Sequence, residues 1–554
     1  MELRPPDMVM RLARLGAAHQ TRLSFMRVLL RKLRREGWCF DRPVWAIGDD
    51  GTGHAVYRVT GPRRSYSLVA FAHDLPDDQR SDRVIAEAWD ATFALVDGTP
   101  SQDDIARLSK NVPLQEAGRV SDAELVLSRA NRSVRLWDHV VERLSTGRQP
   151  DLDRVAEVGY LMRTTAVYGS GKFGAADHAA LSGRPVMGGP FRAEMLAVWL
   201  IRTFVVDLAE HLARVKGESA AVPLDPDLRR TFGIGNSTGL GMAPFLVNHP
   251  TLLNAWISAR ETAIARVRGL KHARPSDAAL LSGLVRRTQA ALTSWRSTDP
   301  ETLRRVEYLK ADCARVSEHL AKGALDQPLP WDQLIDWSRE ALSVDGQELL
   351  GSLILEPHSD LVDDLADAMS VDESAAFQIA GDQTIAELCA ALHTYYGWAL
   401  STDYADEKAC ARFWYTSAAK REPRLGERAL EAGGELEQPL DVARAAASLW
   451  ETLRSRPRDE NVASLLAEAP EHRRMVRRAQ IVAAAPYAEI RDNLIDAEMR
   501  PIDMLRCKLA FFGATRFDPR SDRWLRITMF QSAPYPHELH QMPEDDWIMP
   551  TVAR

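Results

Sequence analysis

Two glycine-rich stretches contain many of the residues in this chain whose types could do chemistry. The first, residues 168–174, reads YGSGKFG. Glycines let backbone N–H groups approach an anion closely, and Lys172 beside them supplies a positive charge. Gly171 and Lys172 match the end of a nucleotide-binding P-loop, but Ala166 and Phe173 stand where that motif needs its first glycine and its magnesium-binding Ser or Thr. Because the stretch is also expected to follow a helix rather than a strand, we exclude a P-loop, and a glycine-rich turn between two helices is the alternative.

The second stretch, residues 233–242, has four glycines with Asn, Ser and Thr between them, so it is not expected to be helical. Its first two glycines begin the dinucleotide-binding pattern G-x-G-x-x-G, but the third comes one residue late. No strand is expected to lead into it and no βαβ unit to surround it, so the stretch is a weak signature of a dinucleotide fold. Two interpretations stay open: a cradle for a phosphate or carboxylate, oriented by Asn236 and Thr238, or a set of sharp turns.

The helix expected over residues 191–216 lies between these stretches and carries two charged residues among apolar neighbours. At about 100° per residue, Glu194 shares its face with Val198 and Ile201, and Arg202 lies at the margin of that face. An unpaired charge in such surroundings is costly. One interpretation is a buried structural ion-pair network. The other is a site in which Arg202 holds an anionic group and Glu194 transfers protons, since burial raises a carboxyl pKa whereas a nearby arginine lowers it.

These features predict a candidate site around the two stretches and the helix between them. Its catalytic candidates are Glu194, Tyr168 and His178, and its substrate-binding candidates are Lys172, Arg202, Arg163, Ser170, Asn236 and Thr238. Arginine favours carboxylate and phosphate groups, because the guanidinium fork binds them bidentately. No spacing of His, Cys, Asp and Glu suggests a metal, and no motif identifies a cofactor.

We therefore predict an enzyme that acts on a small anionic, carboxylate- or phosphate-bearing metabolite by metal-independent acid–base chemistry, as a lyase or transferase would. The alternative is a non-catalytic helical scaffold or ligand-sensing interaction protein, in which the glycine-rich stretches are only turns. The enzyme requires the two stretches and the face of Glu194 and Arg202 to converge on one pocket. A homo-oligomer is compatible with either hypothesis.

The elements expected to position these residues are mainly α-helical, with a small antiparallel β-meander near the N-terminus at residues 44–47, 55–60 and 65–71. Ser101 and Asp104 have the layout of a capping box ahead of a helix. Other helices are expected over residues 7–36, 81–96, 121–144, 151–163 and 251–270, and then in series over residues 277–295, 300–322, 331–342, 383–400, 439–455, 470–485 and 500–512. Residues 524–530 are expected to form one late strand that could join the N-terminal sheet.

The chain has 554 residues, more than a single core usually holds. We divide it into an N-terminal helix, meander and helix (residues 1–100), a helical region with the candidate site (residues 101–272) and a C-terminal helical region with the late strand (residues 273–554).

Composition excludes several classes of protein. Hydrophobic residues make up 45% and charged residues 27%, the balance of a soluble globular protein. The net charge of -7 argues against a general nucleic-acid binder. The five cysteines are scattered without zinc-site spacing, which is typical of reduced thiols. The most apolar run, residues 195–206, is too short to span a membrane, and no secretion signal is evident, so we expect no integral membrane insertion and a cytoplasmic location.

Two further stretches have a functional and a structural interpretation each. Residues 27–35 alternate Lys and Arg with leucines, either as an amphipathic arm for a membrane surface, nucleic acid or partner, or as a solvated helix face whose leucines pack inward. Residues 395–428 combine aromatic and basic residues, which could stack on bases, although packing between helices is the commoner use. Nucleic acid is therefore an unfavoured partner, and a small anionic ligand is the favoured one.

Overall fold

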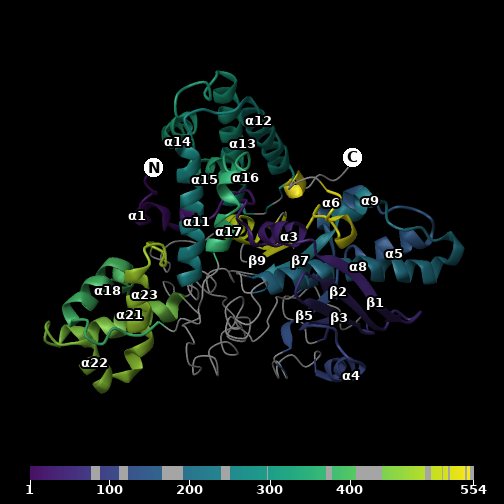
Figure 1. Ribbon diagram of the computed structural model, residues 1–554, viewed down its shortest axis with the longest axis horizontal. Helices are drawn as coiled ribbons and strands as arrows, with labels where there is room; N and C mark the ends of the chain where they lie inside the picture. The colour runs from purple at the N-terminus through teal and green to yellow at the C-terminus, as the bar shows by residue number, and fades with distance from the viewer. Residues whose placement is uncertain are drawn as a thin grey trace.

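The computed structural model describes residues 1–76, 88–111, 121, 123–164, 187, 191–238, 250–295, 297, 299–369, 377–406, 439–492, 501–514, 516–521, 524–542 and 546–549. Within these residues, helices dominate and surround one large sheet (Figure 1). The expected mainly α class is therefore confirmed. The expected small N-terminal meander is wrong in extent, because the sheet is larger and mixed.

Nine of the described strands form this sheet, in the order β1-β2-β3-β4-β5-β6-β7-β9-β8. They are β1 (Cys39–Ile47), β2 (Gly53–Thr60), β3 (Ser65–Ala72), β4 (Ala91–Asp97), β5 (Glu124–Arg132), β6 (Tyr160–Thr164), β7 (Gly233–Thr238), β8 (Arg516–Ser521) and β9 (Trp524–Met529). Neighbours from β1 to β6 pair antiparallel, β6 and β7 pair parallel, and β9 pairs antiparallel with both β7 and β8. The late strand is thus confirmed in the same sheet, which takes strands from all three segments of the chain.

The helices expected over residues 81–96 and 121–144 are wrong where β4 and β5 form. The sheet has a helix on each face, so its inner strands carry apolar residues on both sides and lose the alternation that identifies a strand. Leu68 and Ala70 of β3 belong to the main core, which includes the long helix α8 (Arg192–Gly217). Val69 and Phe71 belong to a second cluster with α4 (Gln102–Asn111) on the other face. The capping box of α4 is confirmed, since Ser101 and Asp104 exchange backbone-to-side-chain hydrogen bonds of 3.0 and 3.1 Å.

Glycines determine the end of one helix and the close packing of one strand. The helix expected over residues 151–163 ends early, as α6 (Leu152–Val158), because Gly159 takes a left-handed φ of 74° and β6 starts at the next residue. The second glycine-rich stretch begins as strand β7, not as a turn or an irregular cradle. A Cβ on Gly235 would lie 2.8 Å from the ring of Tyr160, and one on Gly233 would lie 2.4 Å from the carbonyl oxygen of Met529. These glycines therefore let neighbouring strands pack closely.

The helix expected over residues 7–36 is only partly confirmed, because the chain forms two single turns, α1 (Pro6–Val9) and α2 (Leu12–Leu15), and then the helix α3 (Phe25–Arg35). Five of the described helices were not expected from the sequence, over residues 226–231, 344–353, 359–362, 365–368 and 462–468, whereas those expected over residues 251–270 and in the later series lie close to their predicted bounds. The remaining described helices complete the list. They are α5 (Trp137–Ser145), α9 (Pro226–Thr231), α11 (Pro250–Arg268), α12 (Pro275–Thr293), α13 (Pro300–Ala321), α14 (Pro330–Ala341), α15 (Val344–Leu353), α16 (Ser359–Val362), α17 (Leu365–Ala368), α18 (Ile385–Leu400), α21 (Pro439–Arg454), α22 (Val462–Glu468), α23 (Arg473–Ala484) and α24 (Pro501–Cys507), which continues as a π-helical turn (Lys508–Phe512).

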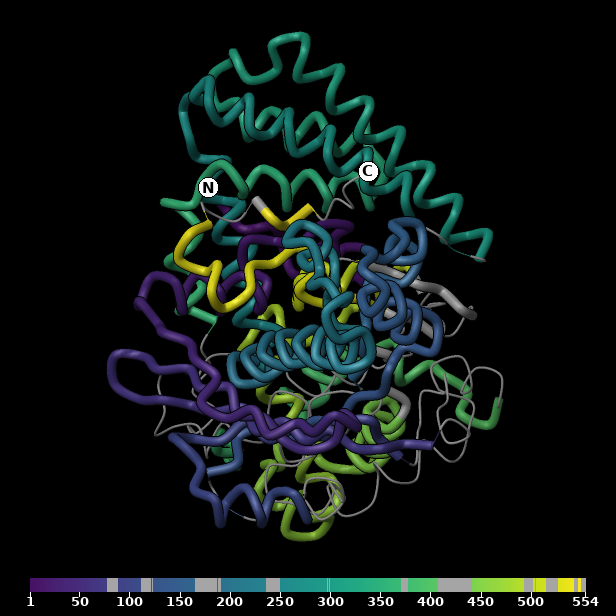
Figure 2. Tube along the Cα trace, turned by 90° about the vertical axis from the view of Figure 1, so that its right-hand side faces the viewer, coloured from purple at the N-terminus to yellow at the C-terminus, as the bar shows by residue number. Residues whose placement is uncertain are grey.

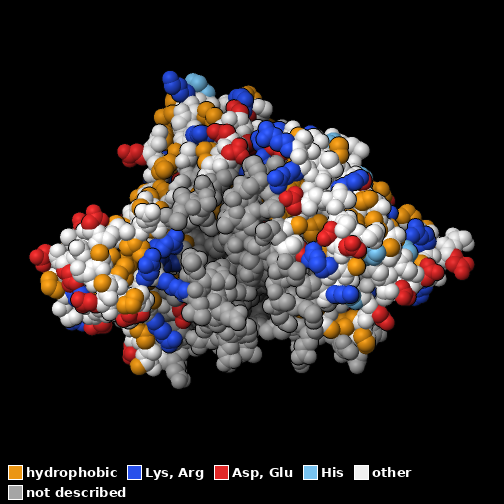
Figure 3. Space-filling view, turned by 60° about the horizontal axis from the view of Figure 1, so that its bottom comes forward, with side chains coloured by type: hydrophobic (Ala, Val, Ile, Leu, Met, Phe, Trp, Pro, Cys, Tyr) orange, Lys and Arg blue, Asp and Glu red, His pale blue; other side chains and the backbone are white. Residues whose placement is uncertain are grey.

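α3 lies at the centre of the molecule, between α8 with the sheet, the helices α12 to α17 and the separate group α18, α21, α22 and α23 (Figure 1). A quarter turn shows α8 lying across the sheet, with α12 and α13 projecting above it (Figure 2). On the face seen in Figure 3, Lys and Arg gather on the inner side of the group α18 to α23, and Asp and Glu lie toward its outer end. Among the described helices, none has the length and apolarity needed to cross a membrane.

Candidate anion-binding site

The sequence-predicted site is described only in part. Tyr168, Ser170, Lys172 and His178 lie outside the described residues. Asn236 and Thr238 are in β7, where the backbone but not the side chains is described. The side chains of Arg163, Glu194 and Arg202 are described, and their surroundings can be compared with the expected roles.

Arg202 is completely buried in the middle of α8. Its Nε, Nη1 and Nη2 atoms donate hydrogen bonds to the carbonyl oxygens of Phe232, Ala533 and Arg230 at 2.6, 2.8 and 3.1 Å. Its guanidinium carbon lies 3.9 Å from the centre of the Tyr535 ring. Burial lowers the pKa of Arg202, and Tyr535 partly offsets the effect. These contacts join α8 to the backbone before β7 and after β9, and a role for Arg202 toward a ligand stays a prediction.

The two glycine-rich stretches are connected to one edge of the sheet. β6 ends at Thr164, which pairs with Asn236 of the parallel strand β7, so the carboxyl ends of both strands meet at the same edge. Phe232, whose carbonyl oxygen accepts a hydrogen bond from Arg202, lies directly before β7. The helix α8 packs on both β6 and β7. The unit β6–α8–β7 is therefore a parallel crossover, whose strand ends and helix N-terminus are the usual place for an anionic ligand.

This crossover corrects the sequence-based interpretation in two respects. The first glycine-rich stretch follows a strand, not a helix, because Thr164 ends β6 four residues before Tyr168. The described part of the second stretch is the last strand of a βαβ unit. The departures from the P-loop and dinucleotide patterns remain, so neither motif is restored.

Arg163 lies in the strand β6, and Glu194 lies apart from Arg202 on the helix α8. Arg163 is buried in β6, in register with Asn131 of β5 and Gly235 of β7. Glu194 is partly buried in the first turn of α8, where the helix dipole favours a negative charge. Eight residues of helix separate it from Arg202, about 12 Å along the axis, which is too far for a direct ion pair.

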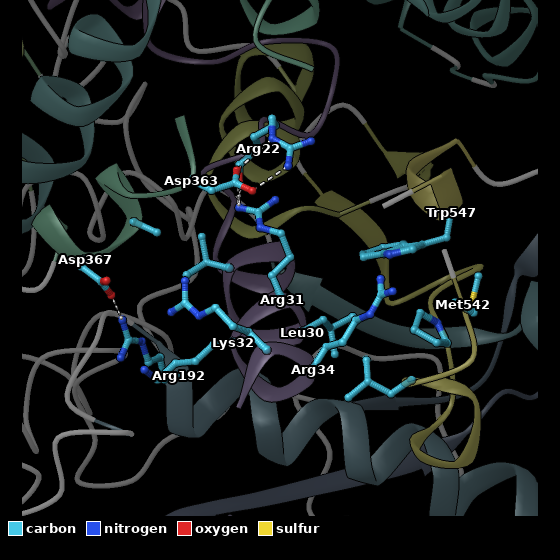
Figure 4. Close-up of a pocket in the computed structure, with 15 residues that line it drawn as sticks. Arg22, Leu30, Arg31, Lys32, Arg34, Arg192, Asp363, Asp367, Met542 and Trp547 are labelled. Carbon is cyan, nitrogen blue, oxygen red and sulfur yellow. Dashed lines mark hydrogen bonds and ion pairs between the residues drawn. The ribbon is translucent and has the colours of Figure 1, made fainter. Parts of the chain in front are cut away.

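A pocket of about 290 Å³ lies beside α3. α3, the start of α8, the turn α17 and the C-terminal segment after β9 form its wall (Figure 4). We call it the arginine pocket, after its lining cations Arg22, Arg31, Lys32, Arg34, Arg35 and Arg192. Two carboxylates, Asp363 and Asp367, line it as well, so the described lining has an excess of positive charge.

One face of α3 carries three arginines whose exposure increases toward the end of the helix. Residues spaced by four share a helix face, which aligns Arg27, Arg31 and Arg35. Arg27 is fully buried and binds both carboxylate oxygens of Glu356 at 2.6 and 2.8 Å. Arg31 is partly buried and Arg35 is exposed. The leucines of this segment pack inward as expected. The charged face is solvated only toward the end of the helix, where Arg35 is exposed, and an arm free of the body is wrong, because most of the helix is buried.

The cations of the pocket differ in how far carboxylates neutralise them. Arg22 binds Asp363 through two hydrogen bonds of 2.9 and 2.7 Å, and Arg31 lies 3.6 Å from the same carboxylate. Lys32 pairs with Glu36 at 2.7 Å. The side chains of Arg34 and Arg35 form no ion pair with any residue in the described part of the chain. Positive charge at the outer half of α3 is therefore left for a ligand.

Arg192 adds a buried cation at the N-terminus of α8. Its side chain is 5% exposed and lies 3.6 Å from Asp367, which is 67% exposed. Burial lowers the pKa of Arg192, Asp367 and Glu36 raise it in part, and Arg35 lowers it again. An anion in the pocket would stabilise the charged guanidinium, because its present surroundings do not fully offset the loss of hydration.

The described lining consists of cationic, carboxylate and apolar side chains. It contains no histidine, cysteine, serine, threonine or tyrosine, and Asp363 and Asp367 both face arginines. Across the described residues, no group of three or more His, Cys, Asp or Glu side chains could hold a metal ion. The arrangement can hold an anion and exclude a cation.

The basic run of α3 is evident in the sequence, but the sequence does not show that this run lines a pocket. The spacing of Arg27, Arg31 and Arg35 by four residues could have indicated one charged helix face. Trp547, which also lines the pocket, carried no sequence signal. In comparisons with known proteins, the chain matches no family model, no curated protein and no solved structure.

Proposed function

We propose that this protein binds a small anionic ligand, bearing a phosphate or carboxylate group, in the arginine pocket. The observation that supports this most strongly is the charge of the lining, where six Lys and Arg residues stand against two carboxylates. Arg34 and Arg35 are available to bind an anion bidentately, and Arg192 adds a further positive charge to the lining.

The proposal keeps the expected ligand class and leaves the expected reaction as a hypothesis. An enzyme acting on this anion by acid–base chemistry would need proton-transfer groups from outside the described lining, with Tyr168, His178 and Glu194 as the candidates. The non-catalytic alternative, a ligand-sensing protein, is supported by the absence of such groups among the described lining residues. The cytoplasmic location and any self-association remain predictions.

Titration calorimetry with phosphate, pyrophosphate and citrate tests the binding. The informative variant is Arg34→Gln combined with Arg35→Gln, because these side chains are partly or fully exposed and should not be needed for folding. A hydrogen bond to a charged group contributes about 1.5–3 kcal/mol, so the double variant should bind at least about tenfold more weakly. Added salt should weaken binding to the wild type as well.

Arg454→Gln is the matched control, because Arg454 also lies in the last turn of a helix and is exposed, but belongs to α21. It should bind as the wild type does. Absence of binding by all three anions at low salt would refute the proposal. Equal binding by the wild type and the double variant would place the site elsewhere.

A further inference from the structure

The cations of the arginine pocket lie around α3 rather than at one point. Figure 4 shows Arg34 on one side of the helix, and Lys32 on the other side, toward Arg192. At about 100° per residue, Arg35 projects about 40° from Arg31 toward the side of Lys32. Arg34 projects about 60° from Arg31 in the opposite direction. The helix therefore turns Arg35, and not Arg34, toward Arg192.

Arg35 and Arg192 are thus two positive charges on one side of the pocket. The side chain of Arg192 is 5% exposed. Arg35 is exposed and forms no ion pair within the described ranges of the chain. The two charges oppose each other, since Arg35 lowers the pKa of Arg192. Two guanidinium groups on one side of a pocket can hold a phosphate or carboxylate group between them, because each presents a planar fork of donors.

The two carboxylates of the pocket differ in how firmly they are held. Asp363 is 28% exposed and accepts two hydrogen bonds from Arg22, at 2.9 and 2.7 Å. Asp367 is 67% exposed and lies 3.6 Å from Arg192, beyond hydrogen-bond distance. Figure 4 shows Asp367 facing Arg192 at a distance from the pair of Asp363 and Arg22. A pair with an exposed carboxylate and no hydrogen bond is weak, so an incoming anion can displace Asp367 more easily than Asp363.

On the basis of the proposed anion binding, we propose that the ligand anion lies between Arg35 and Arg192 and displaces Asp367 from Arg192. Without ligand, Asp367 is the internal counter-ion that offsets part of the charge of Arg192. The ligand must compete with this carboxylate, so Asp367 lowers the affinity of the pocket for anions. Asp363 stays on Arg22 in both states.

Titration calorimetry of the full chain tests the competition, with whichever of phosphate, pyrophosphate and citrate binds most tightly. Asp367→Asn should bind this anion about threefold to fivefold more tightly, because it removes a competing group and a like charge beside the ligand. Asp364→Asn is the matched control. Asp364 belongs to the same turn and is 61% exposed, but its carboxylate accepts a hydrogen bond of 2.7 Å from Arg266, which does not line the pocket. This variant removes the same charge and should change the affinity by less than about twofold.

Separate substitutions of the two neighbouring arginines locate the anion. Arg35→Gln should weaken binding at least about tenfold, the effect of losing a hydrogen bond to a charged group. Arg34→Gln should weaken it by no more than about threefold, because Arg34 would act on the anion only at long range. The side chains replaced in these four variants are partly or fully exposed, so the variants should fold.

The possible results separate the position of the anion, the role of Asp367 and anion binding itself. Equal losses in Arg34→Gln and Arg35→Gln would overturn the position between Arg35 and Arg192. Equal affinities of Asp367→Asn and Asp364→Asn would overturn the displacement of Asp367 and leave anion binding intact. If none of the three anions binds to the wild type, anion binding itself is refuted.

Discussion

Lys508 gives the sharpest prediction about stability, because its amine is buried in the folded protein. It begins the π-helical turn after α24, its side chain is 5% exposed, and its Nζ lies 5.9 Å from the centre of the Phe512 ring. Burial lowers the pKa of Lys508 from 10.5 to about 7. The charged form is thus disfavoured in the folded protein relative to the unfolded chain.

The direction of the pH dependence follows from the two pKa values. The unfolded chain keeps the proton up to about pH 10.5, whereas the folded protein releases it near pH 7. Between these values unfolding takes up a proton, so the free energy of unfolding rises with pH. The full effect is on the order of 5 kcal/mol, of which about 2 kcal/mol falls between pH 7 and pH 9.

Lys508→Met keeps the chain length and removes the titrating amine. We expect this variant to be more stable than the wild type at pH 7, and we expect its advantage to shrink by about 2 kcal/mol at pH 9. Urea unfolding at both pH values measures the difference, and other titrating groups cancel in the comparison. Lys110→Met, at an exposed lysine of α4, is the control and should show no such change. A constant difference between wild type and Lys508→Met would refute the reasoning.

Two buried arginines lead to further predictions. Arg202→Lys cannot reach three separate carbonyl groups, and each buried carbonyl left without a donor costs about 1–3 kcal/mol, so a marked loss of thermal stability is expected; an unchanged melting temperature would contradict the linking role of Arg202. Glu356→Gln leaves Arg27 as a buried charge without its carboxylate and should destabilise the protein by about 3–5 kcal/mol in urea unfolding. A loss below about 1 kcal/mol, typical of exposed pairs, would show that Arg27 is well solvated or differently paired.

The helices could largely be predicted from the sequence, and the strands only in part. α8, α12, α13 and α21 lie within a few residues of their expected bounds, because long periodic segments identify helices well. β4 and β5 were missed because helices cover both faces of the sheet. A buried strand then shows an unbroken apolar run, which periodicity alone does not separate from a buried helix.

For the candidate site, the sequence predicted unusual residues but not their partners. Arg202 was singled out as a charge among apolar neighbours, and it is indeed fully buried. Its partners are backbone carbonyls as distant as Ala533, and no side-chain pattern reports on those. The arginine pocket combines α3, α8, α17 and the C-terminal segment, which are far apart in the chain. Only the tertiary fold brings such segments together.

The crossover β6–α8–β7 gives a physical reason to connect the arginine pocket with the glycine-rich stretches. Both strands end at one edge of the sheet, and α8 begins with Arg192, which lines the pocket. The dipole of this long helix adds positive potential at its N-terminus, and Arg192 adds a full charge at the same place. An anion bound there would gain from both. The ligand expected for the glycine-rich stretches and the ligand proposed for the arginine pocket therefore have the same chemistry, but the Arg34 and Arg35 variants test the arginine pocket alone, because equal binding by the wild type and the double variant would place the anion elsewhere.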